Sequence, residues 1–443
     1  MVFLPAREAT IRTLPLFFPS HQSMPVVIVG AGLLGLTSAF FLKRHGLDVV
    51  VIERQAEVGL ETSFANGGML HASQANPWNE PGVFLTALRM LGREDAALLV
   101  RLRSVPSLLR WGAAFVRESN PARYCRNFEK NARLARYSLA QMVTLRQAIG
   151  TDYDFMQRGT IKLYRTEAEV IAAAALCTQL LEWGINYQVL TPAAAVAIEP
   201  ALGPIESRLA GGLFFPDDEA GDAYRFCRLL AAHLRALGVV FHFNTNVLGL
   251  TGDHHHVRAV RTTLDEHTAE AILLAAGSYT PLLTKSLGLR IAVAPVKGYS
   301  LTVPIKGWSG APQVPVIDDH LHAAVCPLGD RLRIAGTAEF AGYDHALTPG
   351  RIDTLFRLVT ELYPRFAPYL DRAEAAPWTG LRPMSSDGVG IMGRTRIAGL
   401  YLNTGHGPLG WTMAAGAGRL VADEIAGVSP ELALAPYHVT RGT

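Results

Sequence analysis

The sequence predicts an α/β fold, α+β overall, in which a Rossmann-like nucleotide-binding domain carries an inserted antiparallel-sheet domain. Three observations predict it. Residues 25–54 read as strand, glycine turn, helix and strand, which is a βαβ unit. The alternation of strand and helix returns near residue 213 and again near residue 376. Between residues 291 and 340, short strands separated by Gly, Pro and Asp turns indicate an antiparallel sheet.

The nucleotide-binding domain is therefore expected to be assembled from separate segments. Within the insertions, helical periodicity covers much of residues 83–148, and residues 158–165 alternate as a strand does. Asp222 is placed to cap a helix that starts at residue 223. The predicted division is an N-terminal extension, 1–23; a nucleotide-binding domain, 24–79, 213–287 and 376–443; and a substrate-binding domain, 80–212 and 288–375.

Composition narrows the class of function. The 443 residues are 49% hydrophobic and 18% charged, which is ordinary for a globular enzyme. A net charge of +3, without a basic run that has interleaved aromatic residues, argues against nucleic acid as a partner. The four cysteines form no CxxC pair, and His254, His255 and His256 have no carboxylate or thiol at ligand spacing, so no metal site is predicted. The paired acids Asp217, Asp218 and Glu219 are expected to face solvent or cap a helix.

The expected location is the cytoplasm. The first 23 residues have three prolines, a broken apolar run and no small-residue cleavage site, which predicts a disordered extension; a targeting segment is the alternative. No stretch reaches the roughly 18 apolar residues that span a bilayer. Residues 83–118 are basic and amphipathic; we expect their helices to pack on the protein's own core, and contact with a membrane surface is the alternative.

The segment "VVIVGAGLLG" carries Gly30, Gly32 and Gly35, and Glu53 follows at the end of the next strand. This spacing lets backbone N–H groups and a helix N-terminus face a pyrophosphate, while the carboxylate reaches ribose hydroxyls. Dinucleotide binding is predicted, with contacts from Gly30, Ala31, Gly32, Leu33, Leu34, Gly35, Glu53 and Arg54.

Two features favour FAD over NAD as the dinucleotide. No second GxGxxG offers a nicotinamide site, and the apolar strand in "LLAAGSYTP" ends in small residues that permit close backbone approach to a ligand. A crowded strand end is the alternative explanation. The loop "ETSFANGGML" (61–70) offers hydroxyls, an amide and paired glycines beside the phosphates and a flat ring. These segments add the predicted contacts Thr62, Ser63, Asn66, Gly67, Gly68, Met69, Ala275, Ala276 and Gly277. Val247, which lies between the two segments in the sequence, is predicted as a further contact.

Four motifs together resemble one family of flavoenzymes. They are "ETSxANxG", "PVKGYSL" (295–301), "GLRPMSSDGVGIMG" (380–393) and "NTGHGPLGWTM" (403–413). They resemble FAD-dependent D-amino acid dehydrogenases of the D-amino acid oxidase/glycine oxidase superfamily, over about residues 25–426. The resemblance implies an FAD-binding domain of the glutathione-reductase type. It also implies that the late glycine turn reaches the pyrimidine end of the flavin, where backbone N–H groups stabilise negative charge. The implied contacts are Gly405, His406, Gly407, Leu409, Gly410, Trp411 and Thr412.

The resemblance also implies a reaction. Arg382 in "GLRP" would anchor the substrate carboxylate, with a structural ion pair or a flavin contact as alternatives. The α-hydrogen of a neutral amine would pass as hydride to flavin N5, giving an imino acid that hydrolyses to a 2-oxo acid and ammonia; no strong general base is needed. Tyr299 and His322 are the candidates for contact with the substrate amine or side chain; the alternative for each is a position in the core or facing solvent.

Other assignments stay open. The enzyme could instead oxidise glycine, sarcosine or hydroxyproline, or the chain could be an FAD-binding electron-transfer subunit of a larger complex. The electron acceptor, quinone or oxygen, is not decided by any motif. Related dimethylglycine and sarcosine dehydrogenases carry a histidine linked to FAD after a similar loop, which raises His71 as an attachment point; we expect FAD to be held without a covalent bond.

Overall fold

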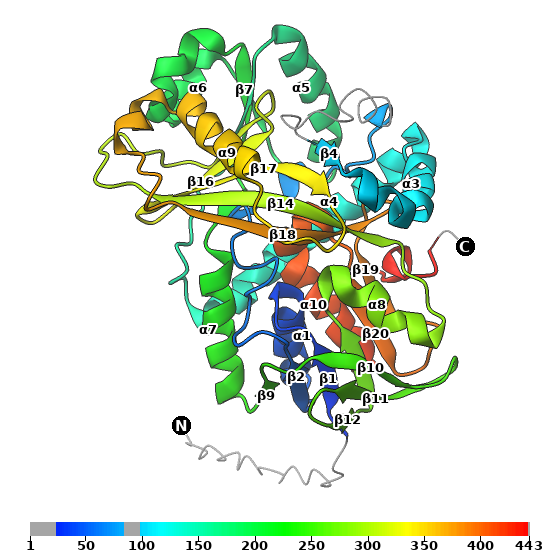
Figure 1. The fold of residues 1–443 in the computed structure, drawn as a ribbon. Helices are drawn as coiled ribbons and strands as arrows, with labels where there is room; N and C mark the ends of the chain where they lie inside the picture. Colours follow the sequence, from blue (N-terminus) through cyan, green and yellow to red (C-terminus); the bar gives the residue numbers. More distant parts are fainter. Residues whose placement is uncertain (1–23, 84–97, 442–443) are drawn as a thin grey trace, which may run out of the picture.

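A six-stranded sheet forms the base of the molecule in the computed structural model, which describes residues 24–83 and 98–441 (Figure 1). Its central strands pair in parallel, and only β19 is antiparallel to its neighbour β20. The sheet order is β19 (Ile391–Arg394), β20 (Leu400–Thr404), β13 (Ala271–Leu274), β1 (Val26–Val29), β2 (Val49–Ile52) and β9 (Val240–His242). Strands β1 and β13 are buried on both faces and are made of Val, Ile, Leu and Ala, as expected for parallel strands under helices.

Helices pack closely on this sheet because glycines lie where they meet. Helix α1 (Leu33–Arg44) packs on α10 (Gly410–Ile425), and a Cβ at Gly418 would come within 2.6 Å of Thr37 Oγ1. Helix α4 (Pro121–Ile149) packs on the other side of α10, against Gly416. Helix α7 (Ala223–Ala236) is capped by Asp222, whose Oδ1 accepts the N–H groups of residues 224 and 225, as the sequence predicts.

A nine-stranded mixed sheet lies above this layer (Figure 1). Most of its neighbours are antiparallel, and β5 with β15 and β4 with β17 are parallel. The order is β18 (Ala376–Ser385), β14 (Val293–Pro304), β17 (Arg331–Phe340), β16 (Ala323–Leu328), β15 (Val316–Asp318), β5 (Thr160–Tyr164), β7 (Gly211–Phe215) and β6 (Gln188–Leu190), with β4 (Leu98–Val100) beside β17. The helices around it are α3 (Val105–Glu118), α5 (Glu167–Glu182), α6 (Pro192–Ile198) and α9 (Pro349–Leu362).

Smaller elements complete the described chain. Strands β10 (Val247–Gly252), β11 (Val257–Thr262) and β12 (Glu266–Thr268) form an antiparallel sheet, and β3 (Met69–Leu70) pairs with β8 (Glu219–Ala220). Helix α8 spans Thr280–Thr284. The 3-10 turns are η1 (Ala72–Gln74), η2 (Leu102–Ser104), η3 (Pro200–Arg208), η4 (Gly277–Tyr279), η5 (Lys285–Leu287), η6 (Pro364–Tyr369), η7 (Gly407–Leu409) and η8 (Ala435–Tyr437).

The predicted fold class is confirmed, and two predicted boundaries differ from the sheets that form. Strands β7 and β18 belong to the nine-stranded sheet, whereas the nucleotide-binding segments were expected to begin at 213 and 376. The reason is that the sequence pattern of an apolar segment indicates a strand, but it does not indicate which other strand that segment will pair with. The predicted N-terminal extension and part of the amphipathic segment 83–118 lie outside the described residues. None of the helices in the described residues is both long and apolar enough to cross a bilayer.

Candidate active site

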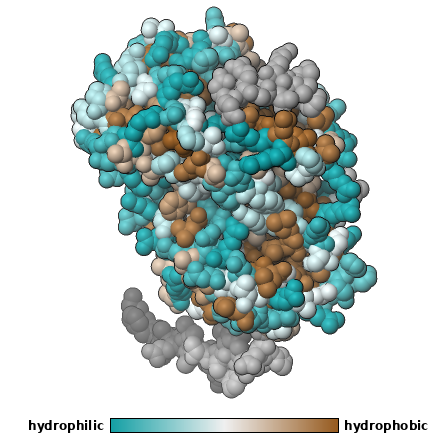
Figure 2. All heavy atoms as spheres, in the orientation of Figure 1, coloured by the Kyte–Doolittle hydropathy of each residue, from teal (hydrophilic) through white to brown (hydrophobic). Residues whose placement is uncertain are grey.

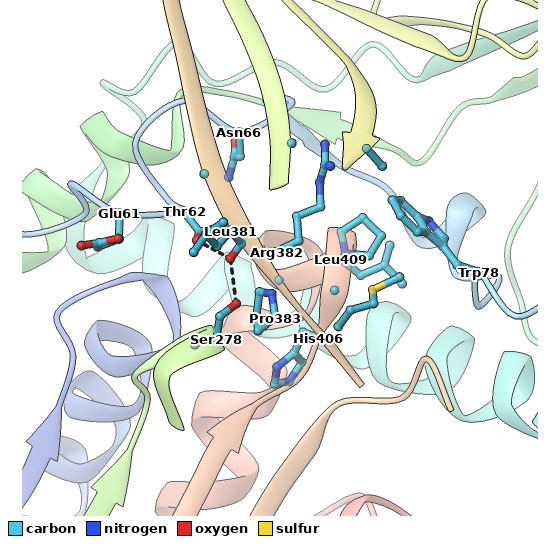
Figure 3. A pocket seen from close by; sticks show the side chains of 18 of the residues that line it. Glu61, Thr62, Asn66, Trp78, Ser278, Leu381, Arg382, Pro383, His406 and Leu409 are labelled. Atoms are coloured by element: carbon cyan, nitrogen blue, oxygen red, sulfur yellow. Dashed lines mark hydrogen bonds between the residues drawn. The ribbon is translucent and has the colours of Figure 1, made fainter. Parts of the chain in front are cut away.

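A cavity of about 1440 Å³ lies between the two large sheets and contains most of the predicted site (Figure 3). Its floor is formed by the carboxyl ends of β1, β2 and β13, which is the edge where open α/β sheets bind ligands. Strands β14, β17 and β18 form its roof. The start of α10 and the loop 61–69 close its sides.

The first glycine turn is built for close contact between the backbone and a ligand. Gly30 has a φ of +107°, and a Cβ there would lie 2.6 Å from the carbonyl oxygen of Ala275. A Cβ on Gly35 would lie 1.9 Å from the oxygen of Gly30, so helix and turn meet only without side chains. The residue preceding α1, Gly32, offers no side-chain cap. The positive end of α1 is therefore available to an anion in the cavity.

Glu53 ends β2 beside this turn. Its Oε2 accepts the N–H of Ala31 at 2.8 Å, and its Oε1 accepts that of Gln55 at 2.9 Å. Burial raises the pKa of Glu53 despite these hydrogen bonds. The next residue, Arg54, places its guanidinium 3.8 Å from the ring centroid of Tyr279 and pairs with Glu61. The carboxylate and the stacked pair thus frame one end of the cavity.

The loop 61–70 connects the nucleotide turn to β18. Thr62 and Ser278 both donate hydrogen bonds to the carbonyl oxygen of Leu381, at 2.9 and 3.1 Å (Figure 3). Ser63 Oγ accepts the N–H of Leu33 at 3.3 Å. These bonds hold the residue that precedes Arg382 at a defined distance from the start of α1.

The second glycine turn, between β20 and α10, also contributes to the lining of the cavity. Gly405 and Gly407 have φ values of +78° and +55°, and Leu409, before α10, provides no side-chain cap. The ring of His406 is buried, and neither of its nitrogens has a hydrogen-bond partner among the described residues. Burial lowers the pKa of His406 to about 3, so the ring is neutral near pH 7. The cavity therefore meets a second uncapped helix start next to a neutral imidazole.

Arg382 projects from β18 into the same space (Figure 3). Its Nη1 lies 3.4 Å from the carbonyl oxygen of Thr337, and its guanidinium lies 5.9 Å from the ring centroid of Trp78. In residues 24–83 and 98–441, no carboxylate forms an ion pair with it. Burial lowers its pKa to about 10, which leaves it cationic at neutral pH. A buried cation without an anion indicates that an anionic ligand completes the site.

Comparison with known proteins identifies the family. Residues 25–424 match the family described as FAD dependent oxidoreductase. The chain belongs to this family. It is 43% identical over 421 residues to a D-amino acid dehydrogenase of Paramagnetospirillum magneticum, covering 95% of this chain and 99% of that one. A D-amino acid dehydrogenase of Rhizobium johnstonii is 41% identical over 418 residues, 94% of this chain and 100% of that one.

Solved structures of other enzymes share the fold of this chain. Glycine oxidase from Geobacillus kaustophilus is 26% identical with a TM-score of 0.72, covering 94% of this chain and 98% of that one. L-proline dehydrogenase from P. horikoshii has a TM-score of 0.75 at 19% identity, over 95% and 97% of the two chains, and shows the same fold. The predicted family, FAD cofactor and reaction class, oxidative deamination of an amino acid, are confirmed by these matches.

The residues of this flavoenzyme fit FAD at both ends of the cavity. Gly30 and Gly32 leave space for a pyrophosphate at the start of α1, and the uncapped start of α10 faces the far side. The buried, unpartnered ring nitrogens of His406 and the indole N–H of Trp411 offer further polar contacts there. One elongated ligand with a phosphate-rich middle and a flat polar ring satisfies all of these groups.

Most predicted cofactor residues line this flavoenzyme's cavity. They are Gly30, Gly32, Leu33, Leu34, Glu53, Arg54, Thr62, Ser63, Asn66, Gly67, Met69, Val247, Ala275, Ala276, Gly277, His406, Gly407, Leu409, Gly410 and Trp411. Five others do not form its surface: Ala31, Gly35, Gly68, Gly405 and Thr412. Of these, Thr412 accepts the N–H of His71 through Oγ1 at 3.1 Å and so supports the loop behind the ring site.

The three predicted catalytic residues differ in their surroundings. Arg382, Tyr299 and His322 all line the cavity. The Tyr299 hydroxyl donates to Glu339 at 2.6 Å and lies 3.0 Å from Thr348 Oγ1, so it is already engaged by protein groups. His322 lies in the exposed turn between β15 and β16 with a φ of +49°. His71 also lines the cavity, its Nδ1 has no partner among the described residues, and burial lowers its pKa to about 4.

The apolar wall beside Arg382 was missed by sequence reasoning. It consists of Trp78, Leu98, Val100, Leu108, Trp111, Phe340 and Met384. These residues come from four separate segments and carry no shared motif, so no signal in one sequence connects them.

The expectation that the acids after β7 face solvent or cap a helix holds for the exposed Asp217 but was wrong for the two residues that follow it. Asp218 and Glu219 are buried rather than solvent-facing. Asp218 accepts a hydrogen bond from Ser73 Oγ at 2.5 Å, and Glu219 forms a two-point ion pair with Arg146. The reason is that β8 pairs with β3, which places both carboxylates under the loop that follows Met69.

Proposed function

We propose that the protein is an FAD-dependent dehydrogenase of D-amino acids with apolar side chains, in which Arg382 holds the substrate carboxylate. The observation that carries the proposal is the cationic, carboxylate-free guanidinium of Arg382 between the flavin-sized cavity and an apolar wall. The names of the relatives from P. magneticum and R. johnstonii support the D configuration.

The cofactor would be held along the floor of the cavity. The N–H groups at the start of α1 would bind the pyrophosphate, and Glu53 the adenosine ribose. Residues 406–411, at the start of α10, would contact the pyrimidine side of the ring, where helix N–H groups favour negative charge. When bound, FAD supplies the acceptor for the two electrons and the hydrogen that leave the substrate α-carbon. His71 keeps a neutral, free ring, and we propose that the cofactor is held without a covalent bond to it.

Arg382 would fix the substrate relative to the flavin. A guanidinium presents parallel N–H donors to a carboxylate, and a hydrogen bond to a charged group contributes about 1.5–3 kcal/mol. Because the cation is already desolvated, pairing with a carboxylate removes a cost that the free enzyme bears. The binding energy therefore serves to orient the α-carbon over the ring.

The apolar wall would receive the substrate side chain. The ring of Trp111 stacks on Phe115 at 4.9 Å and packs on Phe340 at 5.3 Å, and its N–H is held by the carbonyl oxygen of Met384 at 2.8 Å. Trp78 lies next to the guanidinium of Arg382. The residues of this wall are apolar, so a charged substrate side chain packed against them would lose hydration without compensation from them.

The neutral imidazoles of His406 and His71 would affect the binding of the substrate amine near the flavin ring. The pKa values of His406 and His71, lowered by burial to about 3 and about 4, keep both rings uncharged at neutral pH. They add no positive charge to repel the substrate amine, and each retains a lone pair that accepts a hydrogen bond.

The outer face of the cavity favours a quinone as electron acceptor and contact with a membrane surface. Helix α3 buries none of its residues fully; its residue Leu109 is 65% exposed, and Leu102, just before the helix, is 77% exposed. Arg103 and Arg110 are exposed in the same region, and Figure 2 shows apolar and hydrophilic side chains together on the side of the molecule that carries α3. This combination suits an anionic bilayer on the cytoplasmic side. The inner face of α3 lines the cavity, so a hydrophobic acceptor would have an apolar route.

Anaerobic reduction of the purified holoenzyme tests the proposal. Apolar D-amino acids such as D-leucine and D-phenylalanine should bleach the flavin absorbance faster than D-glutamate, and the L enantiomers should not bleach it. A short-chain quinone should then restore the colour faster than dissolved oxygen does. Faster reduction by glycine or sarcosine, or no reduction by any amino acid, would contradict the proposal.

A further inference from the structure

Thr337 adopts a backbone conformation that β-branched residues avoid. Its φ is +58°, in the left-handed region, although it lies within strand β17. The pairing with β14 explains how: Gly298 pairs with Ala338, but Tyr299 pairs with Gly336. Thr337 is thus the extra residue of a β-bulge, a feature that redirects a residue and often lies beside an active site.

The bulge brings the carbonyl group of Thr337 next to Arg382 and leaves the hydroxyl buried in a residue that lines the cavity. Its carbonyl oxygen lies 3.4 Å from Arg382 Nη1. Thr337 is one of the residues that line the cavity, it is 9% exposed, and its buried Oγ1 has no hydrogen-bond partner among the described residues. A buried hydroxyl that has no partner in the protein and lies in a residue lining the cavity is suited to pair with a ligand.

The neighbouring strand leaves room for the guanidinium beside this bulge. A Cβ at Gly298 would lie 2.2 Å from Arg382 Nη1 and 2.6 Å from Nη2. Three adjacent strands therefore contribute to this place: β14 an empty Cβ position, β17 a carbonyl and a hydroxyl, and β18 the guanidinium.

We infer that Thr337 is a substrate-binding and positioning residue of this enzyme. Its carbonyl oxygen orients the guanidinium, and its hydroxyl donates a hydrogen bond to the carboxylate that the guanidinium holds. The inference rests on the proposed role of Arg382 as the carboxylate anchor. It assigns the strained conformation of Thr337 to ligand binding rather than to packing.

Matched variants of Thr337 separate binding from a packing role. Thr337→Val keeps the branched shape but removes the hydroxyl, and it should raise the Kd for benzoate about 10-fold or more, measured from changes in flavin absorbance. Thr337→Ser keeps the hydroxyl and should bind within about 3-fold of the original enzyme. Thr337→Gly relieves the left-handed strain and should bind as weakly as the valine variant.

The neutral analogue benzamide provides the control, because it lacks the carboxylate. Its Kd should change little in all three variants, as should FAD content. Benzoate binding by Thr337→Val and Thr337→Gly at the affinity of the original enzyme would overturn the inference. If the valine variant takes up no FAD, the comparison of Thr337→Ser with Thr337→Gly decides. An original holoenzyme that binds no benzoate and is not reduced by any D-amino acid would overturn both this inference and the proposed function.

Discussion

The guanidinium of Arg382 occupies the space that a side chain on Gly298 would need: a Cβ built on Gly298 would lie 2.3 Å from Arg382 Cζ. The two residues lie on the neighbouring strands β18 and β14. The position of the cation is therefore determined by a missing side chain as much as by the hydrogen bond to Thr337.

Gly298→Ala should displace the guanidinium without removing it. Because a misplacement of about 1 Å can cost about 100-fold in rate, we expect kcat/KM for D-leucine to fall by about that factor while FAD content is unchanged. Gly249→Ala, on β10, is the control, since a Cβ there meets nothing closer than 3.9 Å. Unchanged kcat/KM in Gly298→Ala would show that the guanidinium does not need this space.

Arg382→Met should remove the carboxylate anchor itself. The loss of charge-assisted hydrogen bonds predicts a decrease in kcat/KM of several kcal/mol, roughly 100- to 1,000-fold or more, for carboxylate substrates. Arg382→Lys keeps the charge but loses the planar pair of donors, so its activity should lie between that of Arg382→Met and that of the original enzyme. Stopped-flow reduction of the flavin measures both variants, and turnover by Arg382→Met at the original rate would exclude the assigned role.

Leu108→Arg should change the preference for the substrate side chain. Leu108 lines the apolar wall from α3, which has no fully buried residue, so a longer side chain is tolerated by the fold. A cation there should raise kcat/KM for D-glutamate relative to D-leucine, because the carboxylate gains a partner. Leu176→Arg, at a 57% exposed position of α5, should leave the ratio unchanged. An unchanged ratio in Leu108→Arg would place the substrate side chain elsewhere.

Leu102→Glu tests the membrane contact. Leu102 is 77% exposed beside Arg103 and does not line the cavity, so activity with a soluble acceptor should be retained. A new carboxylate repels anionic lipid, and sedimentation with vesicles of anionic phospholipid should decrease severalfold. Leu176→Glu serves as the exposed control. Equal sedimentation of Leu102→Glu and the original protein would show that the surface around Leu102 does not contact the membrane.

Contiguous motifs were the part of the site that the sequence predicted well. Gly30, Gly32 and Gly35 act within one turn and one helix, so their spacing already describes their geometry. The second turn at Gly405 and Gly407 is equally local, and it was assigned through the family resemblance.

Groups that depend on strand register could not be predicted in the same way. Thr337 becomes special only because a bulge forms opposite Gly298, and nothing in "RIAGTAEF" marks the residue at which the register shifts. The burial of Asp218 likewise follows from the pairing of β8 with β3. Pairing between distant segments is set by tertiary packing, which local periodicity does not contain.

Asp218 should make stability depend on pH. Burial raises its pKa from 3.8 to about 7 although Ser73 donates a hydrogen bond to it. Between about pH 4 and pH 7 the unfolded chain has lost this proton while the folded protein retains it, so the folded state becomes less stable as pH rises through this window. Asp218→Asn cannot ionise, so its stability should depend less on pH. The difference in free energy of unfolding between the variant and the original protein should therefore become more favourable to the variant, by up to a few kcal/mol, from pH 4 to pH 7. Tm measured from pH 4 to pH 8 for both proteins gives the comparison, and Asp217→Asn, beside it but more exposed, should follow the original curve. Parallel curves for Asp218→Asn and the original protein would show that this carboxyl ionises normally in the folded state.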